Sequence, residues 1–338
     1  MNVYYSKEYA KGTRNIARYR RPYLIYNPFA GKLIRTHERL IPHVRDLLRR
    51  DGVDVSLLST NGRGSARDIA RQCVQDGADL ILVAGGDGTV NEVINGMVHS
   101  TVPLGVLPCG TANVLANEVG LGRPDQVAAN LSGLVPARIS LGLLMSEVDR
   151  EARHFLLMAG AGFDALIVHK IDEKMKTVVG KLAYWVAGFS QIGARLPEFN
   201  VDVDDRRYRC SFALASRVCN YGGDLEIARN VSLLDHNFEL VLFEGTSTLP
   251  YVRYFLGVVT NRLRHVKGVT VLHPRAVRLS APDVEEPVYV QADGELVASL
   301  PVTLSIVPRA LTLLVPPKYQ RLQKVFAAEQ VWTPSATA

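Results

Sequence analysis

The sequence predicts an α/β domain built on an open, mainly parallel sheet, followed by a β-rich domain that is expected to form a β-sandwich. In the first part, apolar segments of strand length alternate with amphipathic segments of helical periodicity. After about residue 136 this alternation ends and successive strand-like segments follow. The chain has 338 residues, of which 47% are hydrophobic, and this is enough for two domains.

The elements of the first domain are expected in a regular order from residue 22 onward. Strands are predicted at 23–26, 53–58, 80–84 and 104–107, and helices at 33–50, 65–75, 90–98 and from Thr111. This order is typical of an open α/β sheet, in which ligands bind beyond the carboxyl ends of the strands.

The second domain is expected to consist mainly of short strands. They are predicted at 155–158, 199–203, 209–215, 238–243, 269–272, 277–279, 288–291, 302–306 and 311–315. Two helical insertions, at about 170–195 and 251–265, interrupt them. The predicted division of the chain is a basic N-terminal tail (1–21), an α/β domain (22–135), a β-rich domain (136–318) and a C-terminal tail (319–338).

The strongest functional signal is the loop 85–89, which follows the apolar strand at 80–84. Its three glycines permit a sharp turn that exposes backbone N–H groups. Thr89 and Glu92 have the spacing of a capping box, which predicts a helix start whose partial positive charge suits anionic oxygen. Asp87 would repel phosphate unless it binds Mg²⁺, orients another group or accepts a proton. The loop therefore predicts chemistry on a nucleotide.

Small and polar residues also follow the three other strands of the predicted sheet. The loops are 27–31, 59–62 and 108–113, and the last repeats a glycine-threonine pair at Gly110 and Thr111. Because the carboxyl ends of parallel strands meet at one edge of a sheet, we expect these loops to lie together. A purely structural turn is the alternative for any one loop, but it does not explain small polar residues after four consecutive strands.

The formal net charge of +6 is concentrated near the N-terminus. Residues 1–21 carry six basic residues and one acidic residue, with aromatic and apolar residues between them. Such a tail favours contact with an anionic lipid surface, and a solvated leader is the alternative. The sequence has no nucleic-acid-binding signature, no apolar stretch of membrane-span length, no signal-peptide core and no paired cysteine spacing. We therefore expect a cytoplasmic protein, peripherally associated with the inner face of the membrane, that does not bind nucleic acid.

Further motifs accompany these loops along the chain. They are Asn27-Pro28 with Gly31, the segment 85–91 with Glu92, Gly110-Thr111-Ala112-Asn113, the segment 159–165 and Asp293-Gly294-Glu295. With these motifs the chain resembles, over about residues 20–318, the diacylglycerol kinase catalytic-domain family of soluble bacterial lipid kinases, which includes sphingosine kinases. The resemblance implies an NAD kinase-like or diacylglycerol kinase-like fold. ATP would lie between the α/β domain and the β-sandwich domain, and a lipid hydroxyl would attack the γ-phosphate.

The resemblance implies ATP and Mg²⁺ as cofactors and assigns roles to individual residues. The residues implied in ATP binding are Asn27, Pro28, Phe29, Ala30, Gly31, Thr60, Gly85, Gly86, Asp87, Gly88, Thr89, Val90, Asn91, Thr111 and Glu295. Asp293 is the implied general base, which domain closure would bring to the acceptor hydroxyl. Asp87 is the competing candidate for the base or for a magnesium ligand, and the sequence leaves this division of roles open.

A second, structural magnesium ion is implied just before the strand at 238–243. In the resembling enzymes a carboxylate and backbone carbonyls hold it, and its implied ligands here are Ser232, Asp235 and Asn237; a hairpin turn is the alternative reading. Departures from the family pattern bring this second ion into question, and they are Val114, Ser140 and the pair His236-Asn237.

The main hypothesis is thus an ATP-dependent lipid kinase, in which the helical insertions at 170–195 and 251–265 form apolar edges for the lipid. The alternatives are a small-molecule kinase of the NAD kinase or phosphofructokinase type and a nucleotide-binding regulatory protein without catalysis. The segments 110–113 and 293–295 favour the lipid kinase. The sequence does not identify the acceptor lipid, and a homodimer is left open.

Overall fold

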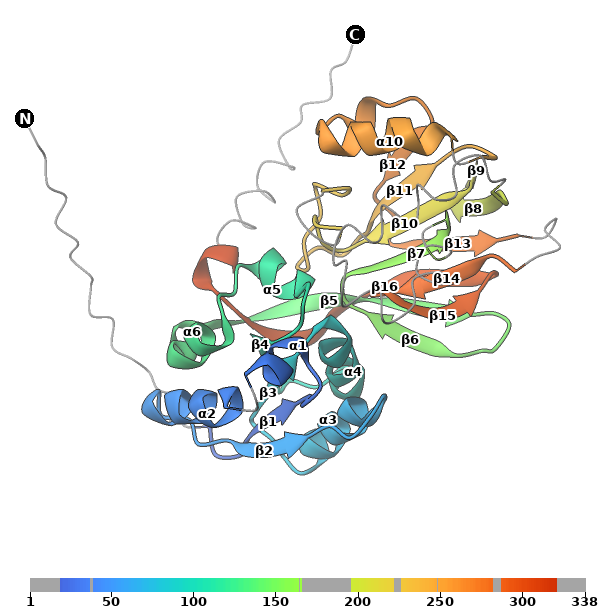
Figure 1. The fold of residues 1–338 in the computed structure, drawn as a ribbon. Helices are drawn as coiled ribbons and strands as arrows, with labels where there is room; N and C mark the ends of the chain where they lie inside the picture. The colour runs from blue at the N-terminus through green and yellow to red at the C-terminus, as the bar shows by residue number, and fades with distance from the viewer. Residues whose placement is uncertain are drawn as a thin grey trace, which may run out of the picture.

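The computed structural model describes residues 19–36, 39–163, 165, 196–221, 226–247, 249–281 and 287–320. The predicted basic tail up to residue 18, the insertion at 170–195 and the chain after residue 320 lie outside the described residues. Figure 1 shows two lobes, one in which helices and strands alternate and one that consists mainly of strands. None of the helices in the described residues combines the length and the apolar character that crossing a membrane requires.

The first lobe is built on four parallel strands. Their order across the sheet is β2, β1, β3, β4, and their bounds are Pro22–Tyr26 for β1, Ser56–Ser59 for β2, Leu80–Gly85 for β3 and Pro103–Pro108 for β4. All six residues of β3 are buried, as expected for a central parallel strand that is covered on both faces.

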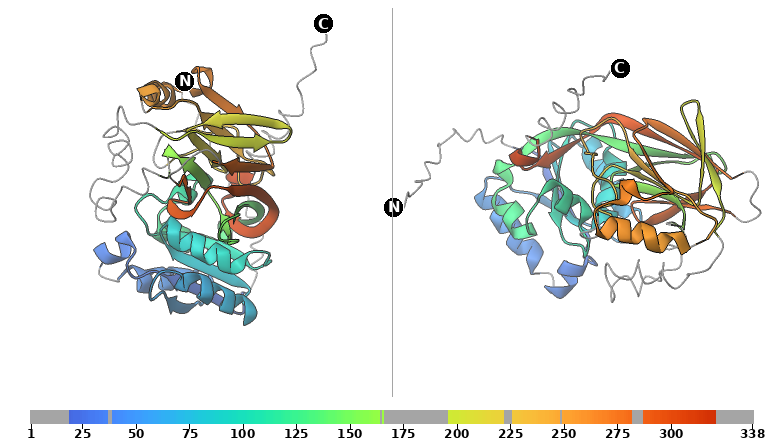
Figure 2. Two further views of the ribbon diagram at one scale, coloured as in Figure 1. Left: turned by 90° about the vertical axis from the view of Figure 1, so that its right-hand side faces the viewer. Right: turned by 90° about the horizontal axis from the view of Figure 1, so that it is seen from above.

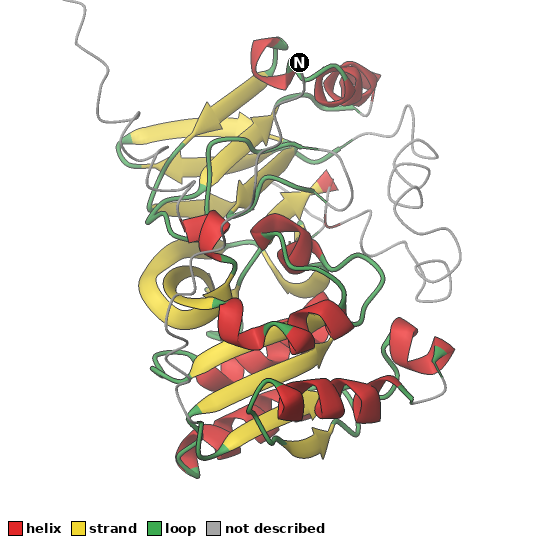
Figure 3. Ribbon diagram, turned by 90° about the vertical axis from the view of Figure 1, so that its left-hand side faces the viewer, coloured by secondary structure: helices red, strands yellow, loops and turns green. Residues whose placement is uncertain are grey.

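Helices cover both faces of this sheet (Figure 3). Their bounds are Gly31–Arg35 for α1, Leu40–Arg50 for α2, Ser65–Gln75 for α3, Asp87–Met97 for α4, Val114–Val119 for α5 and Pro124–Ala129 for α6, with a 3₁₀ turn at Leu131–Gly133. Apolar residues of α1, α2 and α6 share one core cluster, and those of α3, α4 and α5 share another. Consecutive groups of helices thus cover the two faces of the sheet in turn, as in a doubly wound α/β domain.

Two long strands connect the lobes (Figures 1 and 2). They are β5 (Val135–Ser146) and β16 (Val302–Val315), which pair antiparallel along nearly their whole length. The last residues of β16 also pair in parallel with β4, through Thr312 opposite Pro103. The first sheet is therefore completed by a strand from the far end of the chain, an arrangement that the order of elements in the sequence does not reveal.

The second lobe contains two facing sheets. The first sheet continues the parallel sheet of the first lobe through β16, β13 and β8 to β9, and β5 pairs with both β16 and β6. The second sheet has the order β12, β11, β10, β7, β14, β15. The bounds of the strands not given above are Ala152–Phe155 (β6), Met158–Gly162 (β7), Phe199–Val203 (β8), Arg206–Cys210 (β9), Phe212–Ser216 (β10), Glu239–Phe243 (β11), Val269–Leu272 (β12), Ala276–Ser280 (β13), Tyr289–Ala292 (β14) and Glu295–Ser299 (β15). A separate core cluster fills the space between these sheets. The predicted α/β domain with a β-sandwich is confirmed.

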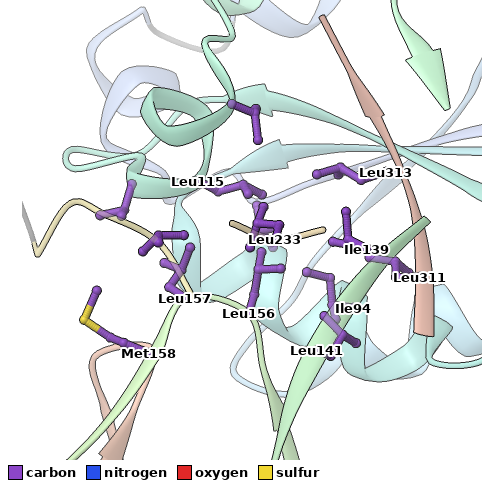
Figure 4. Packing of buried hydrophobic residues seen from close by; sticks show 14 of the residues in the cluster. Ile94, Leu115, Ile139, Leu141, Leu156, Leu157, Met158, Leu233, Leu311 and Leu313 are labelled. Carbon is purple, nitrogen blue, oxygen red and sulfur yellow. The ribbon is translucent and has the colours of Figure 1, made fainter. Parts of the chain in front are cut away.

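The core cluster that contains apolar residues of α3, α4 and α5 continues to where the lobes meet. Figure 4 shows Ile94 of α4 and Leu115 of α5 beside Leu156 and Leu157, which precede β7, and beside Leu233. All of these side chains are buried. Because residues from both lobes fill one core, the lobes do not pack as separate units at this crossing.

Several predicted element boundaries were wrong. Among the strands, the one expected at 155–158 is the end of β6 and the start of β7, the one expected at 209–215 is divided between β9 and β10, and those expected at 302–306 and 311–315 are the single strand β16. The helix expected at 33–50 is two helices, α1 and α2, and the insertion expected at 251–265 is α10 (Leu249–Val259) followed by a 3₁₀ turn at Leu263–His265. The helix expected from Val90 begins at Asp87, whose carboxylate suits the positive end of a helix. The helix expected from Thr111 begins at Val114, because Asn113 has a φ of 49°, in the left-handed region.

Candidate functional site

The site begins with two glycine loops that touch each other. A Cβ atom on Gly110 would lie 2.5 Å from the Cα atom of Gly86, and a Cβ atom on Gly85 would lie 2.6 Å from the Cβ atom of Thr89. Side chains therefore do not fit at these positions without displacing backbone or a β-branched residue. The two loops lie against each other, as the sequence predicts for loops at the carboxyl ends of neighbouring parallel strands.

A cleft of about 750 Å³ opens over these loops. Its lining includes most of the residues predicted to bind nucleotide, namely Asn27, Phe29, Ala30, Gly31, Thr60, Gly86, Gly88, Thr89, Thr111 and Glu295. Gly62, Arg63 and Gly110 complete the polar part of the lining, together with Glu92 and Gly294. Residues from all four predicted loops and from the β-rich lobe thus meet at one cleft, which has the size of a small-molecule site.

Five of the predicted residues do not line this cleft. Pro28 lies between two lining residues, while Gly85 and Val90 are buried beneath the loop. Asp87 and Asn91 point to other partners, which are described below. These five support the cleft from behind or from the side.

Side-chain hydrogen bonds fix the first of the loops. The Asn27 Oδ1 atom accepts a hydrogen bond of 2.9 Å from the backbone N–H of Phe29, and its Nδ2 group donates to Thr89 Oγ1 at 3.2 Å. Asn27 therefore joins the loop after β1 to the loop after β3. Such a contact requires a short side chain that carries both a donor and an acceptor.

The outer rim of the cleft is apolar. The Phe29 side chain is 72% exposed and that of Ile34 is 57% exposed. Large apolar side chains with this exposure beside a polar floor suit a ligand with a flat apolar part and a charged part. Ile34 was not predicted, although its position one helical turn after the first loop indicates that it lies near the cleft.

One carboxylate from the β-rich lobe faces the cleft and is paired with arginines. The Glu295 Oε2 atom lies 2.5 Å from Arg153 Nη2 and 3.2 Å from Arg63 Nη2. Burial opposes ionisation of Glu295, but the hydrogen bonds and charges of Arg153 and Arg63 prevail and hold its pKa below the usual value. The sequence analysis did not identify these two arginines, which no short motif marks.

Asp87 holds the start of a neighbouring helix. Its carboxylate oxygens accept hydrogen bonds from the backbone N–H groups of Val114 and Leu115, at 3.1 and 3.2 Å. Burial raises the pKa of Asp87 above its usual value, and these backbone hydrogen bonds act in the opposite direction. Asp87 therefore joins the two glycine loops, because it belongs to the first and caps the helix that follows the second.

Asp293 lies in a hairpin turn between β14 and β15. Both Asp293 and Gly294 have a positive φ, of 49° and 83°, as in the tight turns that connect antiparallel strands. The Asp293 carboxylate accepts backbone hydrogen bonds from Leu156, Leu157 and Met158, at 2.7, 2.8 and 3.0 Å. Three backbone donors thus fix its position.

A fourth donor to Asp293 comes from the other lobe. The Nδ2 group of Asn91, on α4, donates to Asp293 Oδ2 at 2.5 Å. One turn further along α4, Asn95 exchanges hydrogen bonds with the backbone of His154, at 2.9 and 3.0 Å. Burial raises the pKa of Asp293, and the four donors oppose this rise. The site is therefore held together across the junction between the lobes.

The predicted capping box at the start of α4 was wrong. The Glu92 carboxylate accepts hydrogen bonds from the backbone N–H groups of Gly64 and Ala66, at 2.8 and 3.1 Å, and so caps α3. The Thr89 hydroxyl accepts its hydrogen bond from Asn27. The spacing in the sequence suggested a local contact, but Glu92 satisfies the free N–H groups of a neighbouring helix.

Comparison with known proteins agrees with this geometry. The model of the diacylglycerol kinase catalytic domain matches residues 21–142, and that of the YegS C-terminal NAD kinase beta sandwich-like domain matches residues 158–315. The chain belongs to the diacylglycerol kinase catalytic-domain family. The two matches cover both lobes and therefore include the cleft and the turn that carries Asp293.

Several family members are similar over most of their length. A diacylglycerol kinase from Bacillus subtilis is 28% identical over 291 residues, which are 83% of this chain and 92% of that protein. A diacylglycerol kinase from Mycobacterium tuberculosis is 27% identical over 276 residues, which are 80% of this chain and 87% of that protein. The crystal structure of a diacylglycerol kinase from Bacillus anthracis has a TM-score of 0.69 at 19% identity and covers 89% of this chain and 99% of its own. Membership of this family supports kinase chemistry.

An arginine binds two of the residues that the family resemblance implies as ligands of a second magnesium ion. The Arg217 guanidinium donates to the backbone carbonyls of Asp235 and Asn237, at 3.1 and 3.0 Å, so these two oxygens already have a cation. The Ser232 hydroxyl lies 3.5 Å from the hydroxyl of Tyr319. Within the described part of the chain, no three His, Cys, Asp or Glu side chains form a group that would hold a metal ion. The residues at this position do not fit a structural magnesium ion.

Proposed function

We propose that this protein is an ATP-dependent lipid kinase, which transfers the γ-phosphate of ATP to a hydroxyl group of a membrane lipid with Asp293 as the general base. One observation carries this proposal. The turn after β14 brings Gly294 and Glu295 into the lining of the cleft and places Asp293, at the base of the same turn, against Asn91. A carboxylate from one lobe therefore lies next to the phosphate loops of the other.

ATP fits the two parts of the cleft. The glycine loops and helix starts offer N–H donors for the phosphates, and the hydroxyls of Thr89 and Thr111 add donors to the same lining. Phe29 and Ile34 provide an apolar rim for the adenine ring. The Mg²⁺ ion that accompanies ATP would offset the negative charge of the transferred phosphate. Among the carboxylates that line the cleft, that of Glu295 lies over Gly88.

The hydrogen bonds of Asp293 support its role as the base. Four donors fill its carboxylate, and the only side-chain donor among them, Asn91, belongs to the opposite lobe. A small displacement of the lobes would break the Asn91 hydrogen bond and leave one lone pair of Oδ2 for the acceptor hydroxyl, while the three backbone donors, of which Leu156 also binds Oδ2, keep the carboxylate in place. The raised pKa of Asp293 improves it as a proton acceptor.

Contact with the membrane is proposed for α10, which lies at the outer end of the β-rich lobe (Figure 1). Leu249, Leu256 and Val259 are between 54% and 66% exposed, and Arg253 lies on the same helix. Exposed apolar side chains with a nearby positive charge suit the surface of an anionic bilayer. A Leu256→Asp variant should sediment less with phosphatidylglycerol vesicles than the wild type, and equal sedimentation would argue against this surface.

The activity is tested with purified protein, labelled ATP and separate acceptors. The acceptors are diacylglycerol, sphingosine, ceramide, phosphatidylglycerol, NAD and fructose 6-phosphate. We expect label in a lipid product and none in NAD phosphate. Label in NAD phosphate alone would establish the small-molecule kinase instead, and no transfer to any acceptor would favour a regulatory protein.

The role of Asp293 is tested by Asp293→Asn with a matched control. This variant should bind ATP and lose turnover. Asp204→Asn is the control, because Asp204 is also a turn aspartate with a positive φ, of 50°, and it lies exposed in the β8–β9 hairpin away from the cleft. Normal turnover in Asp293→Asn would assign the proton acceptor to another group, and Asp87 would then be the next candidate.

A further inference from the structure

Arg217 is a fully buried cation at the junction of the two lobes. Its side chain has no solvent exposure, and it follows directly after the last residue of β10. The guanidinium donates four hydrogen bonds to backbone carbonyls, those of Ser140 (3.1 Å), Leu233 (2.8 Å), Asp235 (3.1 Å) and Asn237 (3.0 Å). A buried charge is costly unless it is compensated in this way.

The four oxygens come from two separate segments of the chain. Ser140 lies on β5, the strand that crosses between the lobes, and the other three belong to the turn that precedes β11. Carbonyl oxygens that converge on one point are the arrangement that binds a hard cation such as Mg²⁺ or Ca²⁺. Here the planar guanidinium holds them together.

The surroundings of Arg217 do not favour an additional cation. The pocket beside it contains one carboxylate, that of Asp235, together with His236, His273 and Arg275. The His236 Nδ1 atom lies 2.8 Å from the Ser140 hydroxyl, so two of the residues that depart from the family pattern are partners of each other. A divalent ion would meet one carboxylate and several basic groups.

Arg217 is also connected to the proposed base. Its backbone N–H donates to the carbonyl of Leu157 at 2.8 Å, and the N–H of Met158, which belongs to the same peptide unit as this carbonyl, donates to Asp293 Oδ1 at 3.0 Å. The residue that gathers the four carbonyls therefore fixes one of the peptide units that hold the Asp293 carboxylate.

We propose that the guanidinium of Arg217 replaces a structural divalent metal ion at this junction. Arg217 is also a positioning residue for Asp293. The part of this proposal that concerns Asp293 rests on the proposed kinase function. The part that concerns metal does not, because it is measured on the protein without nucleotide or acceptor.

The first test is metal binding by the wild-type protein in the absence of nucleotide. Free Mn²⁺ is measured by electron paramagnetic resonance in titrations with the full chain, and thermal unfolding is measured with EDTA and with millimolar Mg²⁺. We expect no stoichiometric binding of Mn²⁺ and the same unfolding midpoint in both solutions. One Mn²⁺ ion bound per chain, and lost in Asp235→Asn, would overturn the proposal.

The second test uses Arg217→Ala, with Arg138→Ala as its control. Arg138 lies on β5 and, like Arg217, donates to backbone carbonyls, those of Ser100 and Arg309. Both variants should unfold roughly 5–10 °C below the wild type, since each removes hydrogen bonds to backbone carbonyls. Only Arg217→Ala should regain stability with Mg²⁺ or methylguanidinium. If the added cation raises the unfolding midpoint of neither variant, or of both, the result would contradict a cation site at this junction.

The third test is Arg217→Lys, which keeps the charge and so serves if Arg217→Ala does not fold. An ammonium group cannot reach four carbonyls as the planar fork does. We expect the ATP-dependent rate, kcat, to fall at least tenfold while the KM for ATP remains within twofold of the wild type. A rise in KM with an unchanged kcat would contradict a positioning role for Asp293. If no kinase activity is found in the wild type, the metal measurements still decide the first part of the proposal.

Discussion

Asn91 and Asp293, which lie on opposite lobes, share a hydrogen bond of 2.5 Å at the centre of the junction. The other three donors to the Asp293 carboxylate are backbone N–H groups. Asn91 is therefore the one partner of this carboxylate that a substitution can remove without altering the backbone.

We predict that Asn91→Ala shifts the acid limb of the pH profile of kcat/KM to higher pH. The hydrogen bond from Asn91 stabilises the ionised carboxylate of Asp293. Because Asn91→Ala removes this hydrogen bond, the pKa of Asp293 rises further and the base becomes protonated at a higher pH. We also expect the unfolding free energy to decrease by about 1–3 kcal/mol. Gln72→Ala is the control, because Gln72 also donates from a helix to a carboxylate, that of Asp76, away from the cleft. An acid limb at the wild-type position would exclude this role for Asn91.

The close approach of the glycine loops gives a second prediction. Gly110→Ala would place a Cβ atom 2.5 Å from the Cα atom of Gly86, so the two loops must separate. We expect ATP affinity to fall at least tenfold, as measured by calorimetry, with an unchanged circular dichroism spectrum. Gly62→Ala is the matched control in the same cleft, since no atom lies within 4 Å of a Cβ atom at this position. Equal losses in both variants would mean that any added methyl group disturbs the cleft.

The apolar rim gives a third prediction. Phe29 is 72% exposed, so Phe29→Ala should have little effect on the unfolding midpoint. If the ring stacks on adenine, ATP affinity should fall by roughly tenfold, which corresponds to about 1.4 kcal/mol and lies within the range of about 1–3 kcal/mol for stacking of a base on an aromatic ring. Phe29→Tyr should retain the affinity. Tight binding by Phe29→Ala would place the base of the nucleotide elsewhere in the cleft.

The sequence predicted the fold class and most of the cleft because these depend on local patterns. The buried run of β3, the helix at 65–75 and the glycine loops are each defined by neighbouring residues. The errors concern contacts between distant segments. Glu92 has the spacing of a local cap but binds a neighbouring helix, and β16 returns from the end of the chain to pair with β4.

The position predicted for a second metal ion also depends on a contact between distant segments. Asp235 and Asn237 were identified, and their carbonyl oxygens do converge on a cation. That cation is the side chain of Arg217, from another strand. The only sign in the sequence is a single arginine directly after an apolar strand, which does not reveal its partners.

A buried carboxylate far from the cleft gives a fourth prediction, on stability. The Glu239 side chain has no exposure. It lies 2.5 Å from Arg264 Nη2 and accepts hydrogen bonds from the backbone N–H groups of Arg229 and Asn230, at 3.0 and 2.7 Å. Burial alone would raise the pKa of Glu239, but the His273 side chain, these N–H groups and Arg264 outweigh it and hold the pKa at about 2.

Because the pKa of Glu239 is lower in the folded protein than in the unfolded chain, its contribution is present above the usual glutamate pKa of 4.5 and is lost as the pH falls towards about 2. The size of this contribution is roughly 3 kcal/mol. Glu239→Gln should therefore lower the unfolding free energy at pH 7 and flatten its decline between pH 4.5 and 2. Urea unfolding of both proteins over this range measures the difference, with Glu147→Gln as the control, since Glu147 pairs with Arg278 at the surface. If the unfolding free energy declines equally between pH 4.5 and 2 in the wild type and in Glu239→Gln, other carboxylates cause the loss of stability in acid.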